Sequence, residues 1–159
     1  MASRRRSAEL AVGVISDTHG LLRESAIAAL RGVRHILHAG DVGSADVLAG
    51  LAAIAPVTAV RGNNDHGAWA DVLPGTARIE LGRVRIVVVH DRNELGGAAA
   101  EAADVVVSGH SHRPFVQEVD GRIYLNPGSA GPRRFRLPVA LARLSVSRGR
   151  ARAEIVVLE

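Results

Sequence analysis

Seven side chains with metal-binding donor atoms follow short apolar runs at five places in the chain. In chain order they are Asp17, His19, Asp41, Asn63, His90, His110 and His112. They offer carboxylate oxygens, an amide oxygen and imidazole nitrogens but no thiolate, because the chain has no cysteine. This mixture suits Mn, Fe, Zn, Co or Ni better than Mg or Ca, which prefer shells made of oxygen. Seven ligands are too many for one tetrahedral ion, whereas two divalent ions about 3.5–4 Å apart that share a carboxylate would use them all.

The elements that must position these residues alternate between strand and helix in the first part of the chain. Strands are predicted over residues 11–16, 34–38 and 57–60, with helices over 21–31 and 45–54 between them. This order favours a parallel sheet, which gathers its ligands at the carboxyl ends of the strands. Further strands are predicted over 78–81, 84–89, 104–108, 116–119, 122–125, 139–146 and 151–158, with a further helix over 98–103.

Each ligand segment lies just past the predicted carboxyl end of a strand. Side chains on an extended chain alternate with a period of two, so Asp17 and His19 are expected to face the same way. The same pattern applies to His110 and His112. A glycine directly precedes three of the ligands, at Gly40, Gly62 and Gly109. Because a Cβ there would hinder close approach, we expect the five segments to converge on one rim.

The length and composition favour one domain with an aliphatic core. The chain has 159 residues, enough for a single domain over residues 10–159. Hydrophobic residues make up 47% of the chain and aromatic residues only 3%. No apolar stretch approaches the roughly 20 residues that cross a bilayer, and no cleavable leader follows the basic start. These features and the absence of cysteine predict a cytoplasmic protein that does not contact membranes.

The basic residues are all arginines and gather near both ends of the chain. Residues 1–9 are arginine-rich and are predicted to form a flexible N-terminus. The last third contains Arg133, Arg134, Arg136, Arg148, Arg150 and Arg152. Such clusters can bind phosphate groups. Nucleic-acid-binding surfaces interleave them with aromatic residues, which are scarce in this chain, so a solvated tail and face is the favoured interpretation.

Taken in order, the ligand segments resemble the calcineurin-like metallophosphoesterases, and among them the small YfcE-like phosphodiesterases. The resemblance consists of D-x-H at 17–19, G-D at 40–41, G-N at 62–63, His90 and G-H-x-H at 109–112. It covers about residues 12–128, and the N-P-G-S sequence at 126–129, which follows a predicted strand, is similar to the turn that closes the small members of this family. The resemblance implies an α/β fold: a four-layer αββα sandwich of two mixed β-sheets flanked by helices.

The resemblance also implies a role for each ligand. Asp17, His19 and His112 would bind the first metal ion, Asn63, His90 and His110 the second, and Asp41 would bridge both. Asp41, Asn63 and His90 would act in catalysis through the ions, with a hydroxide held between the ions attacking phosphorus in line. Manganese is the expected metal, with Ni, Zn, Fe, Co or Mg as alternatives.

Two positions depart from the family pattern. Asn64 stands where many relatives have a histidine proposed to protonate the leaving group, and an amide cannot supply a proton near pH 7. YfcE-like members often lack that histidine too, so the difference favours another substrate over an inactive site. Asp91 stands where relatives usually have glycine, and we interpret it as a turn residue, with a place beside the ligands as the alternative.

The candidates for substrate binding are Asn64, His66 and Arg133. His66 closely follows the G-N segment, and Arg133 could help to hold an anionic substrate, although it could equally be surface. His35 and His38 lie inside the predicted second strand and are interpreted as structural. Asp65 is expected to be a turn residue or a partner of the ligands.

The predicted function is metal-dependent hydrolysis of a small phosphate ester, with a diester favoured by the YfcE-like resemblance. A monoesterase or a nuclease on the same site is an alternative, although only the arginine-rich ends support nucleic acid as a partner. A non-catalytic scaffold, like the retromer subunit that has this fold, is the alternative from another class. It is disfavoured because all seven ligands are present. A homo-oligomer is a further expectation that the sequence does not decide.

Overall fold

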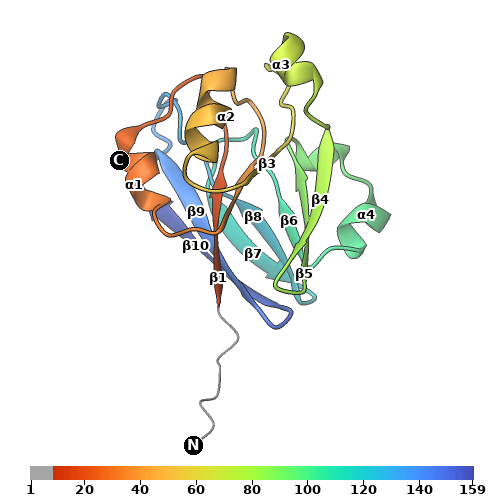
Figure 1. Ribbon diagram of the computed structural model, residues 1–159. Helices are drawn as coiled ribbons and strands as arrows, with labels where there is room; N and C mark the ends of the chain where they lie inside the picture. The colour runs from red at the N-terminus through yellow and green to blue at the C-terminus, as the bar shows by residue number, and fades with distance from the viewer. Residues whose placement is uncertain (1–8) are drawn as a thin grey trace, which may run out of the picture.

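Two five-stranded β-sheets pack face to face in the computed structural model, which describes residues 9–159 (Figure 1). Helices α1 (Glu24–Ala29) and α2 (Ala45–Ala52) lie on one side of the molecule, and α4 (Gly97–Glu101) lies on the opposite side. The predicted sandwich of two mixed sheets flanked by helices is therefore confirmed. Residues 1–8 of the predicted flexible N-terminus lie outside the described residues, so that expectation stays a prediction.

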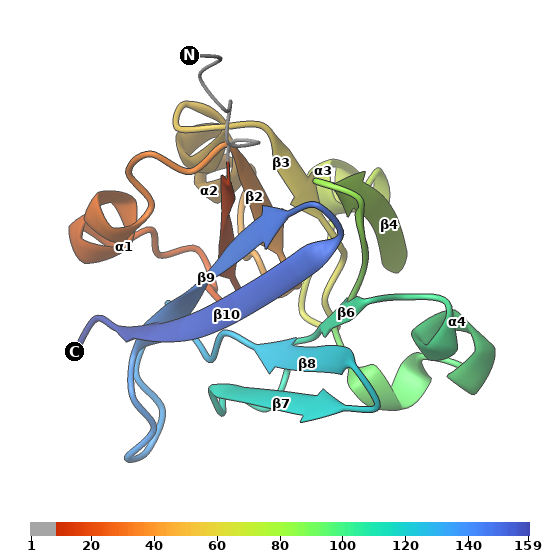
Figure 2. The ribbon, with the colours of Figure 1, turned by 90° about the horizontal axis from the view of Figure 1, so that it is seen from below.

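The first sheet combines the N-terminal strands with the C-terminal hairpin, in the order β10-β9-β1-β2-β3. Its strands are β1 (Leu10–Ile15), β2 (His35–His38), β3 (Val57–Ala59), β9 (Ala140–Ser147) and β10 (Arg150–Val157). β1, β2 and β3 are parallel, as the alternation of strand and helix predicts. β9 and β10 are antiparallel to each other, and β9 is antiparallel to β1 (Figure 2).

The second sheet has the order β4-β5-β6-β8-β7. Its strands are β4 (Thr76–Leu81), β5 (Val84–Val89), β6 (Val105–Val107), β7 (Phe115–Val119) and β8 (Arg122–Asn126). β5, β6 and β8 are parallel, while β4 and β7 are antiparallel strands at the two edges. The turn between β7 and β8 has positive φ at Asp120 (51°) and Gly121 (76°), which confirms the predicted two-residue hairpin.

Alternation along the strands divides the apolar residues between two cores. Val12 and Val14 of β1 point into the space between the sheets, where they join Val88 and other aliphatic residues of the second sheet. Ile15 points the other way and packs with Leu51 under α1 and α2. This division fixes which face of each sheet its helices cover.

Short helices account for most differences from the predicted elements. α1 begins at Glu24 rather than at residue 21, because the Leu21 N–H already closes a turn on the Thr18 carbonyl oxygen at 2.9 Å. α3 (Ala68–Asp71) and the 3-10 helix η1 (Arg92–Glu94) were not predicted, since a single turn carries no readable periodicity. Within residues 9–159, no helix is long and apolar enough to span a membrane.

Candidate metal centre

Left-handed backbone marks the loops that carry the candidate ligands. The φ angle is 54° at Asp17, 45° at His19, 53° at Asp41, 69° at His110 and 62° at His112. Such a conformation costs a residue other than glycine about 1–3 kcal/mol, and it concentrates at functional sites. It also corrects the expectation of extended backbone here, because these segments turn as they leave their strands. The geometry of these turns, rather than alternation along a strand, therefore determines the directions in which the ligand side chains point.

Backbone hydrogen bonds between neighbouring loops hold this turned conformation. The Asp17 N–H donates to the Gly40 carbonyl oxygen at 3.0 Å, and the His19 N–H donates to the Asp41 carbonyl oxygen at 2.9 Å. The segment after β1 is thus paired with the segment after β2 beyond the end of both strands. The backbone of Asp17 and His19 is therefore held in place by the segment that carries Asp41.

Close packing explains why glycines precede the ligands. A Cβ on Gly62 would overlap the backbone and the carboxylate of Asp41, and a Cβ on Gly40 would lie 2.6 Å from His90 Nδ1. A Cβ on Gly109 would collide with the segment after β1 in the same way. The expectation that these glycines permit close approach is confirmed.

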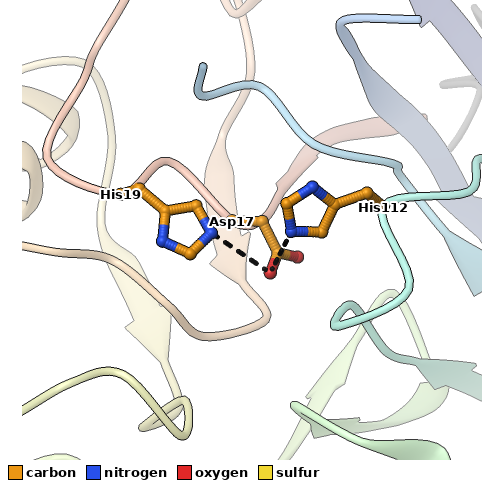
Figure 3. A group of neighbouring side chains, drawn as sticks. All are labelled: Asp17, His19 and His112. Atoms are coloured by element: carbon orange, nitrogen blue, oxygen red, sulfur yellow. Dashed lines mark ion pairs between the residues drawn. The ribbon is translucent and has the colours of Figure 1, made fainter. Parts of the chain in front are cut away.

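Asp17, His19 and His112 form one group of converging ligand atoms (Figure 3). His112 Nε2 lies 3.3 Å from Asp17 Oδ1, and His19 Nε2 lies 3.9 Å from the same oxygen. The other oxygen, Asp17 Oδ2, accepts hydrogen bonds from Ser16 Oγ at 2.6 Å and from the His110 N–H at 3.1 Å. The protein thus satisfies Oδ2 and leaves Oδ1 facing the two imidazoles.

Three atoms of this group are buried without a hydrogen-bond partner in the described part of the chain: Asp17 Oδ1, His19 Nε2 and His112 Nδ1. A buried polar atom without a partner costs about 1–3 kcal/mol. A cation bound by Asp17 Oδ1 and His19 Nε2 would offset the cost of these two atoms, since carboxylate oxygen and imidazole nitrogen are ordinary ligands of divalent transition metals. The donor set therefore fits a metal ion of the kind that the sequence predicts.

Asp17, Asp41 and His90 form a second group, which Asn63 joins. His90 Nε2 lies 3.4 Å from Asp41 Oδ2 and 2.9 Å from Asn63 Oδ1. His90 Nδ1 lies 2.7 Å from the Ala39 carbonyl oxygen, to which its N–H donates. With the proton on Nδ1, Nε2 of a neutral His90 is an acceptor that faces two acceptor oxygens. A metal ion bound by all three atoms would satisfy them, and the carbonyl bond orients the ring for such an ion.

Asp41, a member of the second group, also lies close to the first. Its Oδ2 atom is 3.9 Å from His19 Nε2 and 3.4 Å from His90 Nε2. Asn64 fixes this carboxylate: its backbone N–H donates to Oδ1 at 2.9 Å and its side-chain Nδ2 donates to Oδ2 at 2.9 Å. A carboxylate held in this place is within reach of histidines from both groups.

Charge within the centre shifts the pKa of both Asp41 and His90. Burial disfavours the imidazolium of His90, but the Asp41 and Asp17 carboxylates and the hydrogen bond to Ala39 outweigh burial and raise the pKa of His90 to about 9. Burial also opposes the ionised form of Asp41, yet His90 and the hydrogen bonds from Asn64 hold the pKa of that carboxyl well below its ordinary value. The centre therefore favours ionised carboxylates together with an added positive charge.

His110 and His112 point to different groups, although they are two residues apart. His112 is buried, and its ring centroid lies 5.5 Å from that of His19. His110 has a side chain that is 48% exposed, and its ring lies edge-on to His90 with the centroids 5.1 Å apart. The structure thus brings His110 to the His90 side of the centre, at the edge of the cluster.

The three substrate-binding candidates differ in their contacts with the centre. Asn64 is part of it through its two hydrogen bonds to Asp41. His66 and Arg133 are exposed, and Arg133 Nε donates to the Leu137 carbonyl oxygen at 3.2 Å. The structure therefore gives Asn64 a positioning contact and leaves the other two facing solvent.

Asp65 ties two ligand loops together. Its buried carboxylate accepts hydrogen bonds from the backbone N–H groups of Val42 at 3.2 Å, Gly43 at 3.0 Å and Gly62 at 2.9 Å. The loop of Asp41 is thereby fixed to the loop of Asn63. The expectation of a turn residue or a partner of the ligand segments is confirmed.

Three further residues with structural interpretations are His35, His38 and Asp91. His35 Nε2 lies 2.8 Å from Thr58 Oγ1 of the neighbouring strand β3. The Asp91 carboxylate accepts from the Asn93 N–H at 3.0 Å and caps η1, as a turn residue does, but its Oδ2 also lies 3.9 Å from His110 Nε2, so Asp91 has a place beside the ligands as well. His38 is fully buried in β2, where its Nδ1 accepts from the Gly40 N–H at 3.1 Å and its Nε2 lies 3.0 Å from Thr18 Oγ1.

Sequence reasoning missed the contacts of Asn126 and Ser129, which support the centre from the end of β8. Ser129 Oγ donates to the Asp17 carbonyl oxygen at 3.0 Å. Asn126 Nδ2 donates to the Gly109 carbonyl oxygen at 3.0 Å and so steadies the segment of His110. The N-P-G-S turn at 126–129 was the available signal, but nothing in its letters shows which loops it touches.

Comparison with known sequences assigns the family. The model of the calcineurin-like phosphoesterase superfamily domain matches residues 10–149. A probable metallophosphoesterase of Methanothermobacter thermautotrophicus is 38% identical over 131 residues, which cover 74% of this chain and 76% of that protein. The matched segment contains all seven candidate ligands.

Two solved structures share the fold. An archaeal phosphodiesterase superposes with a TM-score of 0.77 at 23% identity, over 92% of this chain and 100% of that chain. Vps29 of Entamoeba histolytica, solved in complex with Zn²⁺, superposes with a TM-score of 0.71 at 23% identity, over 94% of this chain and 100% of that chain. The sequence matches and the shared fold agree: this chain belongs to the calcineurin-like phosphoesterase superfamily.

Proposed function

We propose that the protein is a metal-dependent phosphodiesterase that holds two divalent ions on either side of Asp41. The observation that carries this proposal is the position of Asp41 Oδ2, within 4 Å of imidazole nitrogens from both groups. His19 and His112 with Asp17 would hold one ion, and Asn63, His90 and His110 the other. Manganese is the proposed metal; the zinc in one Vps29 structure makes zinc the first alternative to test.

Two divalent ions in such a centre supply an activated water nucleophile and stabilise charge on the phosphoryl oxygens. The residues of this chain supply the geometry. Asn64 and the loop bonds of Asp65 fix the Asp41 carboxylate, and the Ala39 carbonyl group fixes the tautomer of His90. Asn64 offers an amide where an acid would protonate a leaving group, so substrates whose leaving group needs little protonation are favoured.

A diester is favoured over a monoester by the resemblance to the small YfcE-like phosphodiesterases, and an archaeal phosphodiesterase shares the fold. A groove of about 440 Å³ on the His90 side, with Arg61, Asp91 and Glu94 in its lining, offers room for the second ester group that a diester carries.

A non-catalytic scaffold is the second candidate, because Vps29 shares the fold. The ligand set of this chain argues against it: a scaffold has no need of five left-handed, strained ligand positions around three buried ligand atoms without hydrogen-bond partners. The two candidates predict opposite results in a hydrolysis assay.

The test is hydrolysis of bis(p-nitrophenyl) phosphate and p-nitrophenyl phosphate by purified protein with Mn, Ni, Zn or Mg added separately. We expect metal-dependent hydrolysis, with a higher kcat/KM for the diester. Asp46→Asn, an exposed carboxylate at the start of α2, is the matched control and should keep full activity. Absence of hydrolysis with every ion would support the scaffold instead.

A further inference from the structure

The loop between β8 and β9 presents an aromatic side chain to solvent among arginines. Phe135 is 94% exposed and has a φ of 53°, a conformation that only glycine adopts without strain. Arg133, Arg134 and Arg136 surround it in the sequence and are exposed as well. The interpretation of the arginines as solvated surface without interleaved aromatic residues is therefore wrong at Phe135.

The base of this loop is fixed to the metal centre. Ser129 Oγ donates to the Asp17 carbonyl oxygen, and Gly131 packs so closely on Asp17 and Thr18 that a Cβ would overlap their carbonyl oxygens. Arg23 Nη2 donates to the Gly131 carbonyl oxygen at 3.2 Å and holds the same point from the side of α1. The loop therefore begins on the backbone of the candidate ligand Asp17 and its neighbour Thr18, and projects from there (Figure 2).

The loop is strongly positive. No carboxylate lies between Asp120 and Glu154 in the sequence. Among the ion pairs of residues 9–159, none involves Arg133, Arg134 or Arg136. Arg134 lies close enough to the centre for its charge to act on His19. The guanidinium groups are thus available to an anionic ligand that reaches the centre.

We propose that residues 133–136 bind the nucleotide portion of the substrate, with a nucleobase stacked on Phe135 and phosphate groups on the flanking arginines. An exposed aromatic ring among cations beside a phosphoesterase centre is the arrangement that binds unpaired bases and their backbone. This inference rests on the proposed phosphodiesterase function and names its substrate class: phosphodiesters that carry an unpaired base. A membrane surface fits less well, because the ring is flanked by arginines and a half-buried Leu137 rather than by further exposed apolar residues.

Binding of fluorescein-labelled single-stranded oligothymidylate to the metal-free protein, measured by fluorescence anisotropy, tests the inference apart from catalysis. Stacking of one base is worth enough for Phe135→Ala to weaken binding by roughly 10-fold. Arg134→Ala should weaken binding and reduce its salt dependence. Val72→Ala and Arg150→Ala remove an exposed apolar residue and an exposed arginine elsewhere, and should leave binding within about twofold.

Competition by a dinucleoside monophosphate shows whether a small diester is sufficient for binding or a longer strand is needed. Either result is compatible with a base stacked on Phe135 and phosphate groups bound by the flanking arginines. Unchanged oligonucleotide binding in Phe135→Ala would overturn the inference. So would binding to vesicles of phosphatidylcholine and phosphatidylserine in the absence of oligonucleotide binding. Hydrolysis of bis(p-nitrophenyl) phosphate by the wild-type protein reports on the phosphodiesterase proposal independently, so failure of one does not conceal the outcome of the other.

Discussion

Replacement of Asp65 by alanine tests how the ligand loops are held together. The Asp65 side chain is fully buried and accepts three backbone hydrogen bonds, from Val42, Gly43 and Gly62. Hydrogen bonds to a charged group contribute about 1.5–3 kcal/mol each, and a buried donor left without a partner costs about 1–3 kcal/mol. Because the three bonds share one carboxylate, their effects are not additive. We expect Asp65→Ala to lower the free energy of unfolding by about 3–5 kcal/mol.

Urea unfolding followed by circular dichroism measures this change, with Asp46→Ala as the control. Asp46 is an exposed carboxylate in the first turn of α2, and its loss should change the free energy of unfolding by less than about 0.5 kcal/mol. Asp65→Asn keeps one acceptor oxygen and should fall between the wild type and the alanine variant. A loss below about 1 kcal/mol for Asp65→Ala would show that the loops are held by other contacts.

Three further predictions concern the surroundings of the ligands. Gly62→Ala places a Cβ against the Asp41 carboxylate and should lower kcat/KM for a diester by about 100-fold, whereas Gly96→Ala, in open space, should not; equal rates would contradict the packing argument. Burial lowers the pKa of His38 to about 4, below the ordinary 6.5, so its stabilising contribution is complete above about pH 6.5 and is lost as the pH falls from there toward 4. The free energy of unfolding of His38→Gln should depend less on pH over this range than that of the wild type, and parallel curves would refute this. Ser129→Ala removes the hydrogen bond to the Asp17 carbonyl oxygen and should weaken metal binding less than Asp17→Ala, by isothermal titration calorimetry; a larger loss for Ser129→Ala would be inconsistent with a supporting role.

Much of the fold could be predicted because the sequence repeats simple patterns. Buried aliphatic runs separated by helices specify β1, β2 and β3 as parallel strands, and two-residue turns such as Asp120-Gly121 specify the hairpins. Polar residues directly after these runs then lie at one rim. The helices were predicted less well, since α3 has only four residues and a single turn has no period to read.

The details of the centre depend on contacts between segments far apart in the chain. The His110 N–H donates to Asp17 Oδ2 across 93 positions, and Ser129 Oγ reaches the Asp17 carbonyl oxygen across 112. No local pattern encodes such pairs. The left-handed backbone at Asp17 was also unreadable, because aspartate adopts both extended and turned conformations, and its choice follows from the loops around it.

Metal content of the purified protein, measured by inductively coupled plasma mass spectrometry alongside diester hydrolysis, tests whether the centre holds two ions and needs them for hydrolysis. We expect about two divalent ions per chain in the wild type after loading with Mn, because Asp41 Oδ2 lies within 4 Å of a histidine from each of the two ligand groups. Asp41→Asn removes the bridging charge and should lower the metal content together with the rate of hydrolysis. Full metal content and full rate in Asp41→Asn, or hydrolysis by a protein without metal, would contradict the account.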